Sequence, residues 1–407
     1  MATTNSSRIQ TIDQIRGIAL LGILIFNIQT YTFFAFLRPE QVYDLGLDQP
    51  EPYAPLQFLT HLLVKGQFYT IYSFLFGLGF FLMWQKNNKA GLNADKLFQR
   101  RLWSLLLIAL IHALVFWFGD VLHKYALLGF SLIYFNKKSV SYLIKWIVGL
   151  LVLMIFIQLV LAFCLPVTLQ SIEANQQQFD KVIMQVLDTW KNGTILEVMS
   201  LQKLGVAMTW VKTISSGLIG FIHFEIMFLL GLIAGKANVF LRIQELRVKL
   251  IKWALILLPI ALVLKAISCL DIFQIQLFPN QPTWEIFIRN TCEGIGTLCL
   301  AFVYLSLLTV ILNNKTTRLQ TWIGNTGRLG LTNYLAQTLI CMLLFYGYGL
   351  GLGGKLTLLQ SFVMAVLIYI FQIIYSNIWL KYATIGPMEK LWRWMTYGKA
   401  PVNNTNT

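Results

Sequence analysis

The chain opens its first membrane-length segment with DQIRG at positions 13–17 and continues it as IALLGILIFNIQTYTFFAF over residues 18–36. A run of about 20 mainly apolar residues is long enough to cross the hydrocarbon core of a bilayer as a helix. Asp13 and Arg16 stand one helical turn apart at its start, where a charged side chain is costly and is kept for a partner or a function. This stretch predicts a helical membrane protein with a charged pair at one membrane boundary.

The composition of the remaining chain supports the same fold class. Hydrophobic residues make up 57% of the 407 residues and charged residues only 12%, whereas soluble domains carry about 25% charged residues. We expect an all-α bundle of ten membrane helices, of which the fourth is the shortest. They lie at about 14–36, 66–84, 102–118, 121–135, 141–166, 214–235, 250–270, 290–312, 329–350 and 356–380.

The net charge of +15 comes from basic residues that alternate along the chain. Lys and Arg gather at Arg8 and in residues 86–101, 137–138, 236–252, 315–328 and 381–399, while the connections at 37–59 and 167–213 are acidic or balanced. Basic connections mark the cytoplasmic side of a membrane protein, so both termini are predicted to be cytoplasmic. Orientation and anionic lipid headgroups account for the positive charge, which excludes nucleic acid as a partner and leaves membrane lipids.

The five cysteines give no sign of a metal centre. Cys164, Cys269, Cys292, Cys299 and Cys341 lie in or beside apolar runs, and none belongs to a CxxC motif. A zinc site or a disulfide framework needs a different spacing, so neither a metal nor a disulfide is expected.

Two predicted helices repeat one arrangement of polar residues. Asn27 follows Arg16 by eleven positions, which returns to within about 20° of the same helix face and climbs roughly 16 Å. His112 follows Arg101 by the same interval, with Arg100 beside it. An arginine at a helix mouth suits the phosphates of a cytoplasmic donor, and a buried imidazole suits a general base. The alternative is that the arginines only set orientation and that His112 is a satisfied core residue.

Two further polar groups are candidates for the same site. Asp120 and His123 lie one turn apart, so the carboxylate can orient the ring; the alternative is a polar turn in contact with outside water. His223 and Glu225 are two residues apart and point to different faces of one helix. We expect Glu225 to face the interior because a carboxylate costs more to bury in lipid.

The segments outside the membrane helices predict a simple domain organisation. Residues 1–385 form one polytopic membrane domain, and residues 386–407 form an interfacial helix, rich in Trp and Arg, with a short cytoplasmic tail. Four prolines predict an outer loop at 37–59. The apolar spacing from Phe179 to Trp190 predicts an amphipathic helix in the outer segment 167–213, which either roofs a cavity or rests on lipid as a linker.

Several motifs occur together, in an order known from one protein family. They are DQIRG at 13–17 with Asn27, FLFGLGF at 74–80, Arg100-Arg101, His112, Gly119-Asp120, YALLG at 125–129, GRLGLTNYLAQ at 327–337 and GPMEKLWR at 386–393. Over essentially its whole length the chain closely resembles the YeiB-like bacterial membrane proteins (domain of unknown function 418). That family resembles the transmembrane acyltransferase superfamily, whose members move an acyl group from cytoplasmic acyl-CoA to a glycan on the far side.

The resemblance implies a set of roles, with one departure. In the glycan O-acetyltransferases an Arg matching Arg16 is followed by a catalytic His, and here Asn27 takes that position. An amide neither takes up nor releases a proton at neutral pH. We therefore expect the base to be His112, with Asp120 or Glu225 as the orienting group.

The functional expectation is a multi-pass acyltransferase of the bacterial plasma membrane. Acyl-CoA, in particular acetyl-CoA, would bind near Asp13, Arg16, Arg100 and Arg101, and the acceptor would be a glycan or lipid of the cell envelope. Two other hypotheses remain: a transporter of a small or lipidic solute, coupled through buried ionisable residues, and a non-catalytic membrane partner that kept the fold. The oligomeric state is left open.

Overall fold

The structure is a computed structural model that describes residues 10–164, 169–313 and 317–398, with side chains omitted for 169–179. The sequence predictions for Arg8, Lys315, Lys399 and the side chain of Phe179 lie outside the described residues. The described chain is helical and contains no strand. Its elements are α1 Gln10–Tyr31, α2 Pro39–Asp44, α3 Pro50–Leu63, α4 Gln67–Lys89, α5 Ala94–Ile111, η1 His112–Phe116, α6 Leu122–Phe135, α7 Val140–Cys164, α8 Leu169–Asn192, α9 Ile195–Ser215, α10 Ile219–Lys236, η2 Val239–Leu241, α11 Ile243–Ser268, η3 Leu270–Phe273, α12 Pro282–Leu312, α13 Arg318–Arg328, α14 Gly330–Phe345, α15 Leu358–Tyr382 and α16 Pro387–Tyr397.

The expected all-α, multi-pass membrane fold is confirmed, with a lower count of spanning helices. Eight helices among the described residues are long and apolar enough to cross a bilayer, or nine if α13 and α14, bent by 81°, are counted as one span. The expected helix at 121–135 is α6, whose 14 residues fall short of a full span. The turn between α5 and α6 explains this difference, because it is buried inside the protein and covered by α9.

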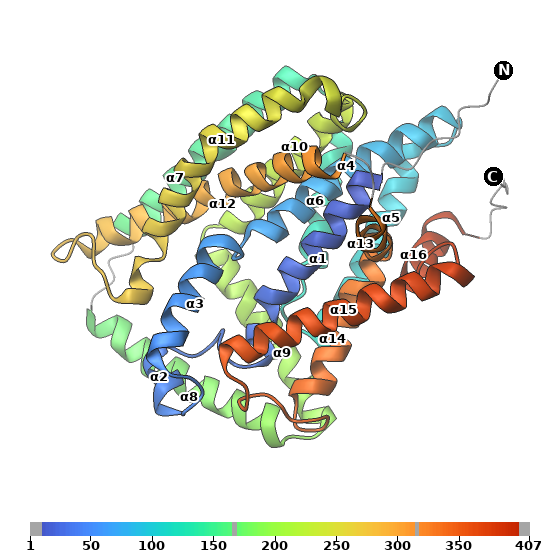
Figure 1. The fold of residues 1–407 in the computed structure, drawn as a ribbon. Coiled ribbons are helices and arrows are strands. Elements are labelled where there is room, and N and C mark those ends of the chain that lie inside the picture. The colour runs from blue at the N-terminus through green and yellow to red at the C-terminus, as the bar shows by residue number, and fades with distance from the viewer. Residues whose placement is uncertain (1–9, 165–168, 314–316, 399–407) are drawn as a thin grey trace.

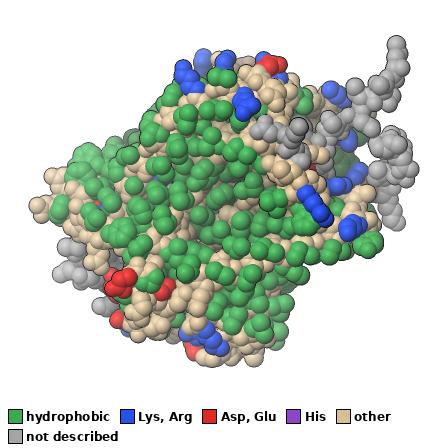
Figure 2. Space-filling model, viewed as in Figure 1, with side chains coloured by type: hydrophobic (Ala, Val, Ile, Leu, Met, Phe, Trp, Pro, Cys, Tyr) green, Lys and Arg blue, Asp and Glu red, His purple; other side chains and the backbone are tan. Residues whose placement is uncertain are grey.

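One end of the bundle collects the basic helix ends. Lys137 after α6 pairs with Asp95 of α5 at 3.1 Å, and Lys236 of α10 donates to the carbonyls of Asn136 and Lys138 at 2.6 and 2.7 Å. In Figure 1, α1 begins and α16 lies at this end. Figure 2 shows many Lys and Arg side chains along this margin and a broad apolar band across the molecule. We call this the basic end and the opposite end the outer end.

Helix α1 lies between two groups of helices, with α7, α11 and α12 on one side and α13 to α16 on the other (Figure 1). A Cβ added to Gly327 of α13 would lie 1.9 Å from the carbonyl oxygen of Asp13, and one added to Gly17 would lie 2.2 Å from that of Ile323. Helices α1 and α13 are therefore in direct backbone contact, which only glycine allows. Gly77 of the FLFGLGF motif makes a similar contact, with the carbonyl of Phe228.

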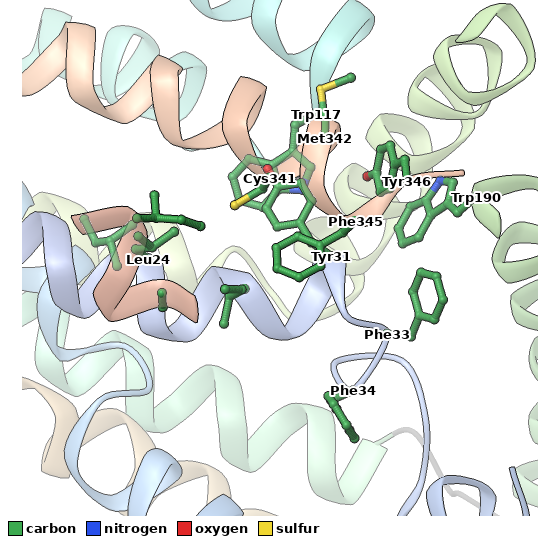
Figure 3. Packing of buried hydrophobic residues seen from close by; sticks show 14 of the residues in the cluster. Leu24, Tyr31, Phe33, Phe34, Trp117, Trp190, Cys341, Met342, Phe345 and Tyr346 are labelled. Atoms are coloured by element: carbon green, nitrogen blue, oxygen red, sulfur yellow. The ribbon is translucent and has the colours of Figure 1, made fainter. Parts of the chain in front are cut away.

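The outer connections are more ordered than the sequence suggested. The expected loop at 37–59 is mostly helical, because prolines begin α2 and α3 and proline is well tolerated in a first helical turn. The amphipathic helix is α8, and its apolar face packs against protein: Trp190 is 1% exposed and stacks on Tyr346 at 5.2 Å. Figure 3 shows the Trp190 and Tyr346 rings close together, with Phe33 and Tyr31 nearby. Helix α8 thus roofs the outer end of the bundle.

Candidate functional site

A cavity of about 310 Å³ extends from the basic end into the bundle. Helices α1, α4, α5, α6, α13, α14 and α16 contribute to its wall. At the basic end its lining includes Arg16, Arg101, Arg328, Glu389 and Trp392. Its inner part is lined by Ile23, Leu105, Val121, Leu122, Tyr125 and Tyr334. The cavity therefore changes from cationic at its mouth to largely apolar at its inner end.

Two of the predicted donor-binding arginines reach this mouth. The Arg101 guanidinium lies 3.4 Å from the centre of the Trp392 ring, and the Trp392 indole N–H donates to the Arg101 carbonyl at 2.9 Å. Arg16 donates to Asp13 at 3.0 Å, so Asp13 positions Arg16 without lining this cavity. Arg100 is exposed and lies outside the lining, because adjacent residues on a helix point about 100° apart.

Helix α16 forms one wall of the mouth, a role that the sequence did not indicate. The Glu389 carboxylate accepts from the backbone N–H groups of Leu331 and Thr332 at 2.7 and 3.0 Å, and from the Thr332 hydroxyl at 2.6 Å. These contacts place a negative charge at the first turn of α14, where free N–H groups favour an anion. The expected interfacial helix is thus also part of the cavity.

A buried polar cluster lies behind the inner end of the cavity. Asp120 holds two imidazoles: one carboxylate oxygen lies 2.7 Å from Nδ1 of His112, and the other accepts from the His123 backbone N–H at 3.0 Å and lies 3.1 Å from its Nδ1. Nε2 of His112 is 3.0 Å from the Thr338 hydroxyl. The His112 ring centre lies 5.6 Å from that of Tyr334, which lines the cavity. Tyr334 therefore lies between the cavity and the polar cluster.

The local backbone explains how Asp120 reaches both rings. His112 begins η1, a single π-helical segment, and its carbonyl accepts from the Trp117 N–H at 2.8 Å. Short π-helical segments frequently occur at functional sites. Burial acts to raise the pKa of Asp120, but the hydrogen bonds and charges of His112 and His123 outweigh it and leave that pKa below its usual value. The two imidazoles thus favour the carboxylate form of Asp120.

The other two predicted catalytic residues have hydrogen-bond partners outside this cluster. Asn27 is buried and accepts a hydrogen bond from Tyr69. Glu225 accepts from Ser131 of α6 at 2.9 Å and is more buried than His223, as expected. Neither side chain contacts Asp120 or lines the cavity.

Sequence reasoning missed Thr338, Tyr334, Arg328 and Glu389 as parts of the site. The motifs at 327–337 and 386–393 contain three of them, but their spacing alone assigned no role. Thr338 carries no sequence signal, because threonine is common in membrane helices. Within the described ranges, no three His, Cys, Asp or Glu side chains are placed to hold a metal ion.

Comparison with known proteins gives one family and several relatives. Residues 234–399 match the family described as "Protein of unknown function (DUF418)". The chain is 27% identical to "Uncharacterized protein YxaH" of Bacillus subtilis (strain 168), covering 97% of this chain and 96% of that protein. It is 28% identical to "Uncharacterized protein YeiB" of Escherichia coli (strain K12), covering 95% of each. The similarity to these relatives extends over nearly the whole chain.

Proposed function

We propose, from the premise that this chain is a YeiB-like protein of the DUF418 family, that it is a membrane acyltransferase. It takes an acyl group from cytoplasmic acyl-CoA, acetyl-CoA among them, and delivers it to a glycan or lipid acceptor on the outer side of the bacterial plasma membrane. The observation that carries the proposal is the cavity, which has a cationic mouth at the basic end and an apolar interior that ends beside His112 and Asp120.

The mouth has the chemistry that a coenzyme A donor requires. The lining of the mouth includes three arginines, Arg16, Arg101 and Arg328, and one carboxylate, Glu389. This carboxylate already accepts hydrogen bonds from the first turn of α14. Arginine binds phosphate oxygens in a bidentate manner and keeps its charge at any physiological pH. We assign the phosphates of the donor to this group of arginines.

The size of the cavity indicates which part of the donor enters it. A volume of about 310 Å³ lies at the lower end of the range of roughly 300–1,000 Å³ for small-molecule sites. It suits a narrow pantetheine arm and a short acyl group, with the nucleotide remaining at the mouth. The apolar inner lining favours the acyl end of the donor by removing it from water.

The polar cluster supplies the acid–base chemistry of the reaction. His112, oriented by Asp120, acts as the general base that an acyl transfer to a hydroxyl needs. This assignment replaces the histidine that the acyltransferase resemblance places at Asn27. Asn27 then has a structural role through its hydrogen bond with Tyr69.

Neighbouring arginines of α5 provide a matched test of the donor site. We expect purified protein in lipid nanodiscs to bind acetyl-CoA in native mass spectrometry and to release free coenzyme A on incubation. Arg101→Ala should weaken binding by about tenfold or more, because a hydrogen bond to a charged group contributes about 1.5–3 kcal/mol. Arg100→Ala removes the same charge outside the cavity. At a salt concentration that screens surface charges, its affinity for acetyl-CoA should stay within about twofold of the wild-type value.

Two results would contradict this proposal. Equal losses in the Arg100 and Arg101 variants would show that the donor does not use the cavity. Uptake of a labelled solute by proteoliposomes without any acyl donor, together with no binding of acetyl-CoA, would favour the transporter hypothesis.

A further inference from the structure

Two neighbouring residues, His112 and Asp120, lie in series with the distant Thr338 behind the cavity. The Asp120 carboxylate is 2.7 Å from Nδ1 of His112, and Nε2 of the same ring is 3.0 Å from the Thr338 hydroxyl. Carboxylate, imidazole and hydroxyl in this order form the arrangement that converts a hydroxyl into a nucleophile on many unrelated folds. We propose that Thr338 is the nucleophile of this site and carries the acyl group as a threonyl ester.

The proposed role of His112 as a base sets the direction of each hydrogen bond. A base enters the reaction as the neutral ring, and an ionised carboxylate only accepts hydrogen bonds, so in this form Nδ1 of His112 donates to Asp120. Nε2 then has a free lone pair and accepts from the Thr338 O–H. The other oxygen of Asp120 is held by His123 through its backbone N–H and its ring, which prevents the carboxylate from turning away from His112.

The cluster is shielded from water on all sides. His112 is 4% exposed, and Asp120 and Thr338 are each 2% exposed. A threonyl ester formed here would be protected from hydrolysis, and an activated hydroxyl would not meet water as a competing acceptor. Burial therefore favours a covalent acyl carrier over an open hydrolytic site.

The position of Thr338 links the cavity to the outer end of the bundle. Thr338 lies one helical turn beyond Tyr334 on α14, a rise of about 6 Å, and Tyr334 lines the inner end of the cavity. The Tyr334 hydroxyl accepts a long, 3.4 Å hydrogen bond from the Val121 N–H. The acyl end of a donor reaches Thr338 when the Tyr334 ring turns aside. This movement breaks the long hydrogen bond between Val121 and Tyr334.

A buried hydrogen-bond donor, the Trp117 indole N–H, lies beside the cluster and can bind the oxygen of the acyl carbonyl. Trp117 is 3% exposed, its ring centre is 6.4 Å from that of His112, and its indole N–H has no hydrogen-bond partner among the described residues. Buried polar groups are nearly always paired, so an unpaired one requires an explanation. Binding the developing oxyanion of the acyl carbonyl would satisfy this N–H.

The proposed reaction has two balanced steps. In the first, the Thr338 oxygen bonds to the thioester carbonyl carbon, its proton passes to Nε2 of His112, the C–S bond breaks, and the thiolate leaves as the thiol with that proton. In the second, an acceptor hydroxyl attacks the threonyl ester, its proton passes to His112, and the C–O bond to Thr338 breaks as that proton returns to the threonine oxygen. Donor and acceptor then need not occupy the site together.

This inference rests on the proposed function only for the identity of the donor. The test therefore uses two acyl donors: acetyl-CoA, and p-nitrophenyl acetate, which carries no coenzyme A. Wild-type protein in nanodiscs, quenched in acid within the first turnovers, should gain one acetyl group in intact-protein mass spectrometry. Peptide mapping should place that group on Thr338.

The variants separate chemistry from folding. Thr338→Val keeps the shape of the side chain, should lose the adduct and should lower turnover about a thousandfold or more, as the loss of a nucleophile does elsewhere. Thr338→Ser keeps a hydroxyl and should retain the adduct. Thr309→Val, at a buried threonine of α12 outside the cavity, should behave as wild type, and thermal unfolding confirms that each variant folds.

Each outcome decides between the two proposals. An adduct on Thr338 from both donors supports both. An adduct from p-nitrophenyl acetate alone keeps Thr338 as the nucleophile and removes acyl-CoA as the donor. Absence of any adduct on Thr338, or undiminished turnover in Thr338→Val, overturns this inference; if acetyl-CoA is still consumed, the acyltransferase proposal survives with direct transfer.

Discussion

The two ends of this bundle differ in how their polar groups are used. At the basic end a cavity is already formed and its charges have partners, as in Arg16 with Asp13 and Arg101 with Trp392. At the outer end aromatic side chains fill the space beneath α8 (Figure 3). There the Trp190 indole N–H and the hydroxyls of Tyr346 and Tyr348 are buried and have no hydrogen-bond partner among the described residues.

In the proposed reaction the two substrates would therefore meet different sites. The donor would enter through the mouth at the basic end, whereas an acceptor coming from the outer end would have to part α8 from the bundle. The predictions below test whether the two ends act independently.

The largest effect is expected from removing the aromatic anchor of α8. Trp190→Ala should destabilise the outer end by about 3–5 kcal/mol, because it leaves a large cavity in a dense core. Thermal unfolding in detergent and protease sensitivity of α8 measure this loss. Trp253, which is 54% exposed on α11, provides the matched control, since most of its side chain lies on the protein surface.

The same variant tests the independence of the two ends. Affinity for acetyl-CoA should be unchanged in Trp190→Ala, because Trp190 does not line the cavity. A loss of affinity as large as that of Arg101→Ala would show that the outer packing shapes the donor site.

A smaller effect is expected from a methyl group placed between α1 and α13. Gly327→Ala puts a Cβ within 1.9 Å of the Asp13 carbonyl oxygen and 2.5 Å of the Gly17 nitrogen. Backbone atoms cannot turn aside, so the helices have to separate, at a cost of about 1–3 kcal/mol. Because Gly327 and Arg16 both line the mouth, affinity for acetyl-CoA should fall together with the melting temperature.

Gly149 of α7 is the control for this substitution. A Cβ there meets no atom within 4 Å, so Gly149→Ala should stabilise by up to about 1 kcal/mol through helix propensity alone. If Gly327→Ala is equally well tolerated, the backbone contact between α1 and α13 is not as close as described.

The smallest effect is expected from the ion pair that ties residues 32–38 to α8. Arg38 lies 2.6 Å from Asp180, and both side chains are partly exposed. Such a pair contributes about 0–1 kcal/mol and is screened by salt. Arg38→Ala should therefore increase proteolysis of α8 slightly at low salt and have no effect at about 1 M salt, where the Debye length is near 3 Å. An effect that persists at high salt would indicate a role for Arg38 other than charge.

Several features of the site followed from local sequence. Hydropathy predicted most of the spanning helices because each such helix needs about 20 apolar residues wherever it lies in the bundle. Helical spacing placed Asp13 within reach of Arg16, and Asp120 within reach of His123. These relations hold within one helix or one turn, so they do not depend on the rest of the fold.

Other features depended on contacts between distant segments. Both Arg100 and Arg101 were predicted to bind the donor, and only the packing of α16 on α5 distinguishes the residue that lines the cavity from its exposed neighbour. The shortness of α6 follows from the cover that α9 provides over a buried turn. Neither relation can be read from composition, since both depend on which faces meet.

The sequence by itself determined a helical, multi-pass membrane protein with arginines at one boundary and a histidine deeper in the same helix, because hydrophobic length and helical rotation are local properties. Only the tertiary structure decided that Asp120 holds both His112 and His123, that Thr338 completes the series, and that Glu389 caps α14. The contacts of Thr338 and Glu389 join residues far apart in the chain, so they depend on how the helices pack against one another.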